Sequence, residues 1–253
     1  MAATNRAAVP ALMRMASHPL RWAVLTELAA GDRRVRELAA AVGEPQNLVS
    51  YHLRLLRSAG LIDARRSSFD GRDSYYRLDV SRCAGAFGEA AAALHPALAH
   101  APAVKPPRRS VLFLCTGNSA RSPMAAALLE KKGQGRIRAA SAGSHPKSSV
   151  HRNAVRVMRE MYDIDLGGGR PQPLTAVHRR RFDQVITLCD KVREYARDHG
   201  LATTMHWSVP DPSIAANSDR NSYPEFRRVA SELNSRIDFL LPVLARGADP
   251  GDR

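Results

Sequence analysis

Two residues of complementary chemistry, Cys115 and Arg121, lie six positions apart near the middle of this 253-residue sequence. A cysteine thiolate is a strong nucleophile, and the planar guanidinium of arginine can bind two oxygens of a tetrahedral anion at once. Small and polar residues fill the interval and can present successive backbone N–H groups to such an anion. We therefore predict an oxyanion-binding loop beside Cys115 and Arg121, formed by Thr116, Gly117, Asn118, Ser119, Ala120 and Ser122.

This loop needs a strand before it and a helix after it. Residues 111–114 form an apolar run typical of a short buried strand that ends on Cys115. Ser122-Pro123 marks a helix start, because proline suits the first turn of a helix. The positive end of a helix favours anions, and cysteines placed there commonly titrate at about 3.5–7.5. We therefore expect Cys115 to be a reactive thiolate at the floor of an anion site.

The rest of this half alternates between strands and helices. Apolar runs predict further strands at 137–142, 182–188 and 203–207, and helical spacing predicts helices at 124–132, 151–162, 191–199 and 222–244. Such alternation predicts an α/β domain over residues 110–246 with a parallel four-stranded sheet, which binds its ligand at the carboxyl ends of the strands. Cys115, Cys189 and Asp211 each follow a predicted strand and can converge there.

The Cys-x5-Arg-Ser pattern, with Gly117-Asn118-Ser119 inside it, resembles the low-molecular-weight protein tyrosine phosphatases and the arsenate reductases built on the same fold. The resemblance covers about residues 109–245. It implies that Asp211, in a Pro-Asp-Pro segment, donates a proton to the departing oxygen, and a carboxyl group near an anion should have a raised pKa. In this resemblance Cys189 corresponds to the strand-end cysteine of thioredoxin-coupled arsenate reductases. The alternative, that Cys189 is only a thiol packed in the core, is equally open.

Two departures from the phosphatase pattern favour the reductase. The phosphatases usually place aromatic residues after the Asp-Pro, where this chain has Ser-Ile-Ala at 213–215, and a second cysteine at the position of Ala120. In a reductase, Cys115 forms a thiol–arsenate intermediate and a second thiol releases As(III). The alternatives are a protein tyrosine phosphatase and a catalytically weak domain that senses an oxyanion.

The reductase hypothesis does not identify the second thiol. The third cysteine of the thioredoxin-coupled family falls on Ala196 here, so its internal relay is incomplete. Either a Cys115–Cys189 disulfide forms and is reduced directly by a thioredoxin-type oxidoreductase, or an external thiol such as mycothiol or glutathione resolves the intermediate. No bound cofactor is expected.

The first hundred residues predict a winged helix-turn-helix. Helical spacing at 9–30, broken at His18-Pro19, is followed by helices at 35–42 and 45–58 and by strands at 61–66 and 73–78, joined across Asp70-Gly71. Residues 51–61 resemble the ArsR-type repressors. That resemblance implies binding to a double-stranded DNA operator, with base contacts from the fourth helix and phosphate or minor-groove contacts from the wing. The candidate contact residues are Gln46, Asn47, Ser50, Tyr51, His52, Arg65, Arg66 and Arg72.

An alanine-rich helix is predicted from Val80 to about His100, and in ArsR-type proteins the terminal helices form the homodimer interface. Many of these repressors bind As(III) through a cysteine pair after Glu-Leu in the third helix, where this chain has alanines at 39–41. We therefore expect no As(III) site there. Cys83 is expected to be a packed thiol, and His95 and His100 to be exposed helix-end residues, with no metal site.

Composition restricts the remaining possibilities. Three cysteines are too few for a disulfide scaffold, and the absence of long apolar runs or an N-terminal signal pattern predicts a cytoplasmic protein with no membrane partner. The net charge of +14 is shared about equally between residues 1–110 and 111–253, so the charge does not say which half binds DNA. We expect a DNA-binding and dimerisation domain at 1–100, a proline-rich linker at 101–109, the α/β domain at 110–246 and a disordered tail at 247–253.

Overall fold

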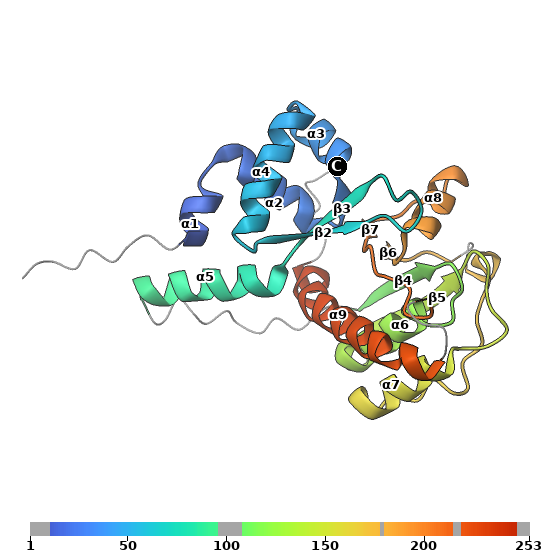
Figure 1. Ribbon diagram of the computed structural model, residues 1–253. Helices are drawn as coiled ribbons and strands as arrows, with labels where there is room; N and C mark the ends of the chain where they lie inside the picture. Colours follow the sequence, from blue (N-terminus) through green and yellow to red (C-terminus); the bar gives the residue numbers. More distant parts are fainter. Residues whose placement is uncertain (1–10, 96–107, 178–179, 215–218, 247–253) are drawn as a thin grey trace, which may run out of the picture. The chain divides into compact units, whose positions relative to one another are not determined.

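A computed structural model describes residues 11–95, 108–177, 180–214 and 219–246 of the chain (Figure 1). These residues form two compact units, one ending with the helix before residue 96 and the other beginning at the strand near residue 109. Each unit is described by itself. The expected linker, apart from residues 108 and 109, and the expected tail at 247–253 lie outside the described residues.

The first unit is mainly helical. Its helices are α1 (Ala11–Ala16), α2 (Pro19–Ala29), α3 (Val35–Val42), α4 (Gln46–Ser58) and α5 (Val80–Leu94). Pro19 lies in the first turn of α2, and Gly43 ends α3 in the left-handed conformation that glycine adopts readily. The apolar faces of α2, α3 and α4 meet in one core, which includes Leu28, Leu38, Val49, Leu53 and Leu56.

A small antiparallel sheet completes this unit, in the order β1-β3-β2. The wing consists of β2 (Ile62–Arg66) and β3 (Ser74–Leu78), as the sequence predicts. A two-residue strand, β1 (Arg33–Arg34), pairs with β3 through Tyr75 and Tyr76 and was not predicted, because two residues give no periodic signal. The N-terminal helix-turn-helix is confirmed.

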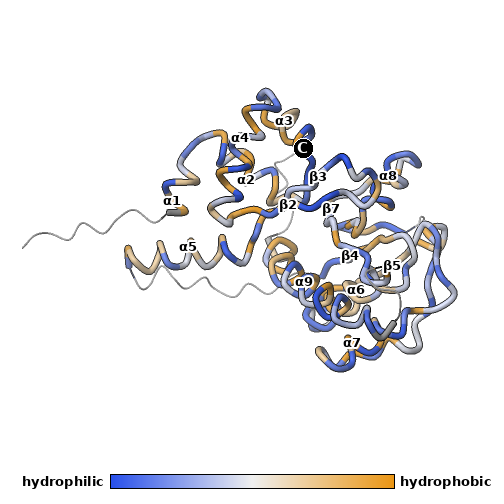
Figure 2. Tube along the Cα trace, in the orientation of Figure 1, coloured by the Kyte–Doolittle hydropathy of each residue, from blue (hydrophilic) through white to orange (hydrophobic). Residues whose placement is uncertain are grey.

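The helix α5 carries hydrophobic as well as hydrophilic residues along its length (Figure 2). Phe87 and Leu94 are exposed, Leu94 by 79% of its surface. The helix was predicted to run to about residue 100, but it ends at Leu94, because His95 is an exposed C-cap with an extended backbone. His100 lies outside the described residues.

The second unit is an α/β fold with a four-stranded, fully parallel sheet in the order β5-β4-β6-β7, which confirms the predicted fold class. Its strands are β4 (Arg109–Cys115), β5 (Ile137–Gly143), β6 (Gln184–Thr187) and β7 (Met205–His206). Its helices are α6 (Arg121–Gly133), α7 (Arg152–Tyr162), α8 (Asp190–Asp198) and α9 (Asp219–Arg246), with a 3-10 turn at Leu174–Ala176.

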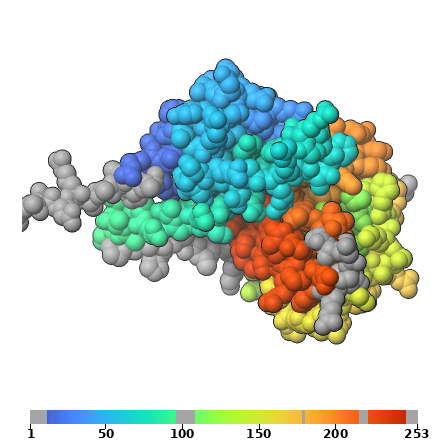
Figure 3. Space-filling view, in the orientation of Figure 1, coloured from blue at the N-terminus to red at the C-terminus, as the bar shows by residue number. Residues whose placement is uncertain are grey.

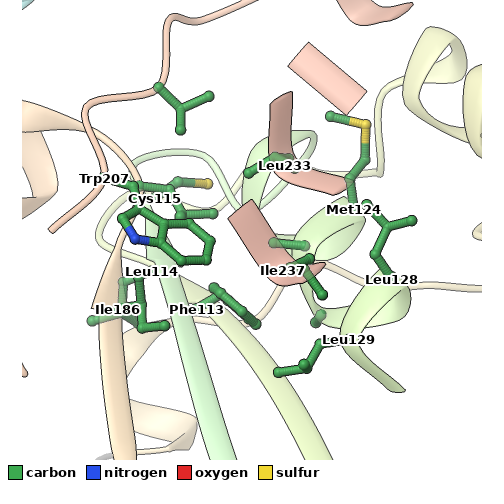
Figure 4. Close-up of a cluster of buried hydrophobic side chains, with 14 of the residues drawn as sticks. Phe113, Leu114, Cys115, Met124, Leu128, Leu129, Ile186, Trp207, Leu233 and Ile237 are labelled. Atoms are coloured by element: carbon green, nitrogen blue, oxygen red, sulfur yellow. The ribbon is translucent and has the colours of Figure 1, made fainter. Parts of the chain in front are cut away.

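The core of this unit lies between the sheet and the helices α6 and α9 (Figure 4). Phe113 and Leu114 on β4 are fully buried, as are Leu129 on α6 and Leu233 and Ile237 on α9. The unbroken burial of β4 from Val111 to Cys115 explains the apolar sequence of this stretch, which is typical of a central parallel strand covered on both faces. This packing fixes the carboxyl end of β4, where Cys115 lies.

Two helices of this unit begin earlier than the sequence predicts. The helix α6 starts at Arg121 instead of residue 124, with Pro123 inside its first turn, so Arg121 and Ser122 are themselves helical. The helix α9 starts at Asp219 instead of residue 222 and contains Pro224 and Pro242. Within the described ranges, no helix is long and apolar enough to span a membrane.

Candidate active site and nucleic-acid interface

The loop between β4 and α6 is held by a network of hydrogen bonds. Asn118 has φ 43°, a left-handed conformation that asparagine tolerates, and its Nδ2 donates to Ser122 Oγ at 2.9 Å. Its Oδ1 accepts the backbone N–H of Gln172 at 2.6 Å. A side chain at Gly143 would place its Cβ 2.6 Å from the Thr116 carbonyl, so glycine is required where β5 ends beside the loop.

A second segment, residues 145–151, binds the loop from outside. The backbone N–H groups of His145, Lys147 and His151 donate to the carbonyls of Thr116, Gly117 and Ser119 at 2.9, 3.0 and 2.7 Å. The C=O and N–H of a trans peptide point in opposite directions. The N–H groups that follow these carbonyls therefore point away from the segment, as an anion-binding loop requires.

The loop encloses a pocket of about 260 Å³. The pocket is lined by Cys115, Thr116, Gly117, Ser119, Ala120, Arg121, His145, Lys147 and Asp211. Two residues expected to bind the oxyanion, Asn118 and Ser122, do not line it, because both are buried behind the loop as its braces. Ser122 Oγ lies 3.0 Å from Cys115 Sγ.

His145 and Lys147 were missed by the sequence analysis. Both follow the carboxyl end of β5, and the rule that ligands bind at that edge of a parallel sheet was the signal that could have identified them.

Arg121 and Asp211 form an ion pair inside the pocket. Arg121 is 5% exposed; its Nη2 donates to Asp211 Oδ2 at 2.7 Å and its Nη1 to the Val209 carbonyl at 3.1 Å. Burial alone would raise the pKa of Asp211, but the Arg121 charge and hydrogen bonds from Ser213 outweigh it and hold that pKa below its usual value. The raised pKa expected for Asp211 beside an anion stays a prediction, since the charge that contacts its carboxylate here is the Arg121 cation.

The expected low pKa of Cys115 is not found. Burial raises the pKa of this thiol, which is 2% exposed, and the Arg121 charge and the hydrogen bond from Ser122 only partly oppose the rise. The positive charge of Arg121 is shared with Asp211, so it stabilises the thiolate less than a free guanidinium would. Burial therefore favours the thiol form of Cys115 in this arrangement.

We predict from this arrangement that the rate at which iodoacetamide modifies Cys115 continues to rise at pH values above 9.0, the ordinary pKa of a cysteine thiol. Replacing Asp211 with asparagine removes a negative charge from the pocket, so the pKa of Cys115 should fall and the neutral-pH rate should rise several-fold. Peptide mass spectrometry of alkylation against pH measures this. Asp165→Asn, at an exposed carboxylate, is the control, and a slower reaction in Asp211→Asn would contradict the account.

The second candidate thiol, Cys189, lies beside the same loop. It follows β6 as the N-cap of α8, it is 2% exposed, and its Sγ is 3.3 Å from Thr116 Oγ1. The structure thus brings together Cys115, Arg121, Asp211 and Cys189. Ala196, where a relay cysteine was considered, is packed on α8 and 1% exposed.

A buried polar cluster adjoins Cys189. Asp190 Oδ1 accepts from Ser208 Oγ at 2.8 Å and lies 3.3 Å from His206 Nε2, while His206 Nδ1 lies 2.8 Å from Thr187 Oγ1. Burial opposes ionisation of Asp190, but hydrogen bonds from His206 and Ser208 help to hold its pKa far below the usual value. These contacts hold Asp190, the residue that follows Cys189, in the interior of the unit.

In the first unit, α4 presents part of the predicted DNA-binding surface to solvent. Gln46, Asn47 and Tyr51 are exposed and Ser50 is half-buried. His52 differs from the expectation: it is 5% exposed and its ring lies 4.6 Å from that of His18. With 3.6 residues per turn, position 52 shares the inward face of α4 with Val49, Leu53 and Leu56. Burial, aided by His18 and Arg21, lowers the pKa of His52.

The wing carries the predicted arginines. Arg66 and Arg72 are exposed and Arg65 is half-buried. In the space-filling view, atoms coloured for residues near 50 and for those near 70 both lie on the surface (Figure 3). Arginine side chains on an exposed hairpin suit contacts to phosphates.

The thiol of Cys83 is packed in the first unit, 7% exposed, as expected. Burial, with a contribution from the Asp79 charge, raises its pKa to about 11. No group of three or more His, Cys, Asp and Glu residues that could hold a metal occurs in the part of the chain that the structure describes.

Comparisons with known proteins find relatives of both units. Residues 110–248 match the family model for low molecular weight phosphotyrosine protein phosphatase, and residues 18–64 match that for bacterial regulatory proteins of the arsR family. An arsenate reductase of Halalkalibacterium halodurans is 33% identical over 135 residues, 51% of this chain and 93% of that protein. A glutaredoxin arsenate reductase of Synechocystis is 29% identical over 138 residues, 54% of this chain and 99% of that protein.

Solved structures also match the second unit. A structure described as an arsenate reductase in the phosphate binding state is 26% identical, with a TM-score of 0.43, over 54% of this chain and 98% of that one.

Proposed function

Since the chain belongs to the low molecular weight phosphotyrosine protein phosphatase family over residues 110–248, and its residues 18–64 match the arsR family model, we propose an arsenic-responsive DNA-binding regulator fused to a thiol-dependent arsenate reductase. The observation that carries the enzymatic part is the pairing of two buried thiols at one loop. Cys115 lies at its start and Cys189 contacts the next residue, Thr116. A hydrolytic phosphatase needs only one such thiol. A reductase must supply two electrons, and two thiols supply them by forming a disulfide.

The first step uses the ion pair between Arg121 and Asp211. Arsenate accepts hydrogen bonds from the Arg121 guanidinium, which then no longer pairs with Asp211. Asp211 then faces an anion, its pKa rises, and it can carry the proton that the departing oxygen needs. The Cys115 thiol gives its proton to Asp211, and the resulting thiolate attacks arsenic to form a sulfur–arsenic bond. One arsenic–oxygen bond breaks, and the departing hydroxyl takes the proton from Asp211 and leaves as water.

The second step moves the electrons. The thiolate of Cys189 attacks Cys115 Sγ, the sulfur–arsenic bond breaks, and its electron pair stays on arsenic, which leaves as arsenite. A Cys115–Cys189 disulfide remains, and a thioredoxin-type dithiol restores both thiols by supplying two electrons. In the alternative, mycothiol or glutathione attacks the adduct in place of Cys189.

The protein tyrosine phosphatase remains the second candidate, because Cys115, Arg121 and Asp211 would serve phosphoryl transfer equally well. In that reaction water regenerates Cys115, and no reductant is consumed. The residues after Asp211 give it little support, since the exposed hydrophobic side chain there is Ile214 and not an aromatic ring.

One assay separates the two candidates. The purified full chain is incubated with arsenate and, in turn, with thioredoxin and its reductase, mycothiol with its regenerating system, or glutathione with glutaredoxin; p-nitrophenyl phosphate is tested in parallel. We expect arsenite production that stops when the thiol is omitted, and little phosphate ester hydrolysis. Rapid ester hydrolysis with no arsenite under any thiol would replace the reductase with the phosphatase.

For the first unit we propose binding to an inverted-repeat operator as a homodimer. One recognition helix reads too few bases for specificity, and two-fold protein symmetry matches a palindromic site. The helix α5 supports a self-association surface, because it is rich in alanine and glycine and exposes Phe87 and Leu94.

We predict different effects for the two classes of DNA contact. Arg66→Ala should weaken binding to all sequences and reduce the slope of log K against log salt by about 1, as expected for a lost phosphate contact. Asn47→Ala should relax base preference, with a cost of about 1–3 kcal/mol on the preferred site. Fluorescence anisotropy with operator and scrambled DNA measures both, and Arg159→Ala in the second unit is the control. Equal losses on both DNAs for Asn47→Ala would exclude a base contact.

A further inference from the structure

The side chain of Lys147 is a cation at the mouth of the oxyanion pocket for which the proposed chemistry has no use. Its backbone N–H donates to the Gly117 carbonyl at 3.0 Å, which fixes the start of the side chain beside the loop. Its Cγ and Cε lie 3.5 and 3.7 Å from the point where a Cβ on Gly117 would be, so the aliphatic stem packs over that glycine. The residue is exposed, yet it lines the pocket.

The two cations of the pocket differ in depth and in partner. Arg121 is almost fully buried and paired with Asp211, whereas Lys147 lies at the solvent side. The Lys147 charge reaches into the pocket, since it helps to lower the pKa of Asp211. The remaining titratable groups of the lining are His145 and Cys115. An anion in the pocket would therefore meet positive charge at its inner and its outer end.

The shape of the ligand decides what the outer charge can do. When a tetrahedral oxyanion binds the loop N–H groups and the Arg121 guanidinium through its other oxygens, one oxygen remains and points to the mouth of the pocket. In inorganic arsenate or phosphate this oxygen is free to accept a hydrogen bond from an ammonium group. In an ester or a phosphonate, an organic group takes that place and offers the ammonium no charged partner.

We propose, on the basis of the oxyanion site above, that Lys147 is a specificity-determining residue that selects inorganic tetrahedral oxyanions over their organic derivatives. It acts on binding: a charge-assisted contact to the outward oxygen strengthens the complex of the inorganic anion and leaves the organic one almost unchanged. The two departures from the phosphatase pattern at positions 120 and 213–215 then have a counterpart in the segment after β5, at the same carboxyl edge of the parallel sheet.

The test compares two ligands on three variants of the full chain. Lys147→Gln removes the charge and keeps most of the stem over Gly117, Lys147→Arg keeps the charge, and Lys132→Gln removes a charge that pairs with Asp238 away from the pocket. The probes are inorganic phosphate and phenylphosphonate. Each protects Cys115 from iodoacetamide, and mass spectrometry of the Cys115 peptide gives the half-protecting concentration relative to the unprotected rate of the same variant.

We expect Lys147→Gln to raise the half-protecting concentration of phosphate about tenfold, the effect of one lost charge-assisted contact. That of phenylphosphonate should rise less than about threefold, which is what a general loss of positive field would produce. Lys147→Arg and Lys132→Gln should resemble the parent for both ligands. In turnover, Lys147→Gln should raise KM for arsenate and leave kcat within about twofold, the pattern of a lost binding contact.

Two results would overturn the inference: an unchanged phosphate value in Lys147→Gln, or equal losses for the two ligands. Circular dichroism and the parental behaviour of Lys147→Arg separate these results from misfolding. The protection assay consumes no electrons, so it is independent of the proposed reductase activity. A chain that reduces no arsenate but shows the expected ligand difference would remove the reductase and leave the role of Lys147 standing.

Discussion

Replacing Cys189 with serine is expected to stop arsenate reduction after its first step and to leave arsenate attached to Cys115. The thiol of Cys189 lies 3.3 Å from the Thr116 hydroxyl, in direct contact with the loop that holds the nucleophile. Serine keeps the volume and a hydrogen bond to Thr116, but its hydroxyl cannot accept the Cys115 sulfur and release two electrons to arsenic. The sulfur–arsenic bond should therefore form and persist.

Intact-protein mass spectrometry after mixing with arsenate measures the trapped adduct, and arsenite release measures the lost turnover. Cys83→Ser is the matched control, because this thiol is buried in the other unit and has a raised pKa of about 11. If Cys189→Ser keeps most of its activity with mycothiol or glutathione, a small thiol resolves the adduct and Cys189 is a core residue.

The substitution Arg121→Ala should reduce turnover on the order of a thousandfold, the effect of removing a main donor to the reacting oxyanion. It should also abolish the protection of Cys115 by phosphate, since the buried fork is lost. The carboxylate of Asp211, half-buried and now without its guanidinium partner, should have a higher pKa than in the parent. Stability that depends on this ion pair is present above the pKa of the unfolded chain and is lost as pH falls through the lower, folded value. That acid-side loss should be absent from Arg121→Ala.

Arsenite production and thermal unfolding between pH 3 and 7 measure these effects. Arg156→Ala, which removes an exposed guanidinium from Glu160, is the control. Retention of phosphate protection in Arg121→Ala would show that the oxyanion lies elsewhere in the unit.

Local patterns were enough to predict the loop and the sheet. The apolar run of β4, Ser122-Pro123 and the alternation of strands with helices each encode an element within a few residues. The order of elements then requires a parallel sheet, whose carboxyl edge gathers Cys115, Cys189 and Asp211. The winged helix-turn-helix was predicted in the same way, from helical periods and one Asp-Gly turn.

The features that the sequence did not predict are set by contacts between distant segments. Lys147 reaches the pocket because its N–H pairs with the Gly117 carbonyl, and no motif records such a contact. The lowered pKa expected for Cys115 was wrong, because burial outweighs the Arg121 charge, which the thiol shares with Asp211. The burial of His52 follows from its phase on α4 relative to Val49 and Leu53, and the helical period could have revealed it.

The isolation of Cys83 has a consequence for how the chain would register arsenic. Arsenite is a soft centre that is held by two or three thiolates, and the first 109 residues contain one cysteine, whose thiol is buried and has a pKa of about 11. The remaining two thiols of the chain are those of the proposed catalytic pair. If they also retain arsenite, they can do so only while reduced, because their disulfide has no lone thiolate to offer. Release from DNA would then require both arsenite and a supply of cellular reductant. When the cellular thiols are oxidised, the protein would stay on DNA even if arsenic is abundant.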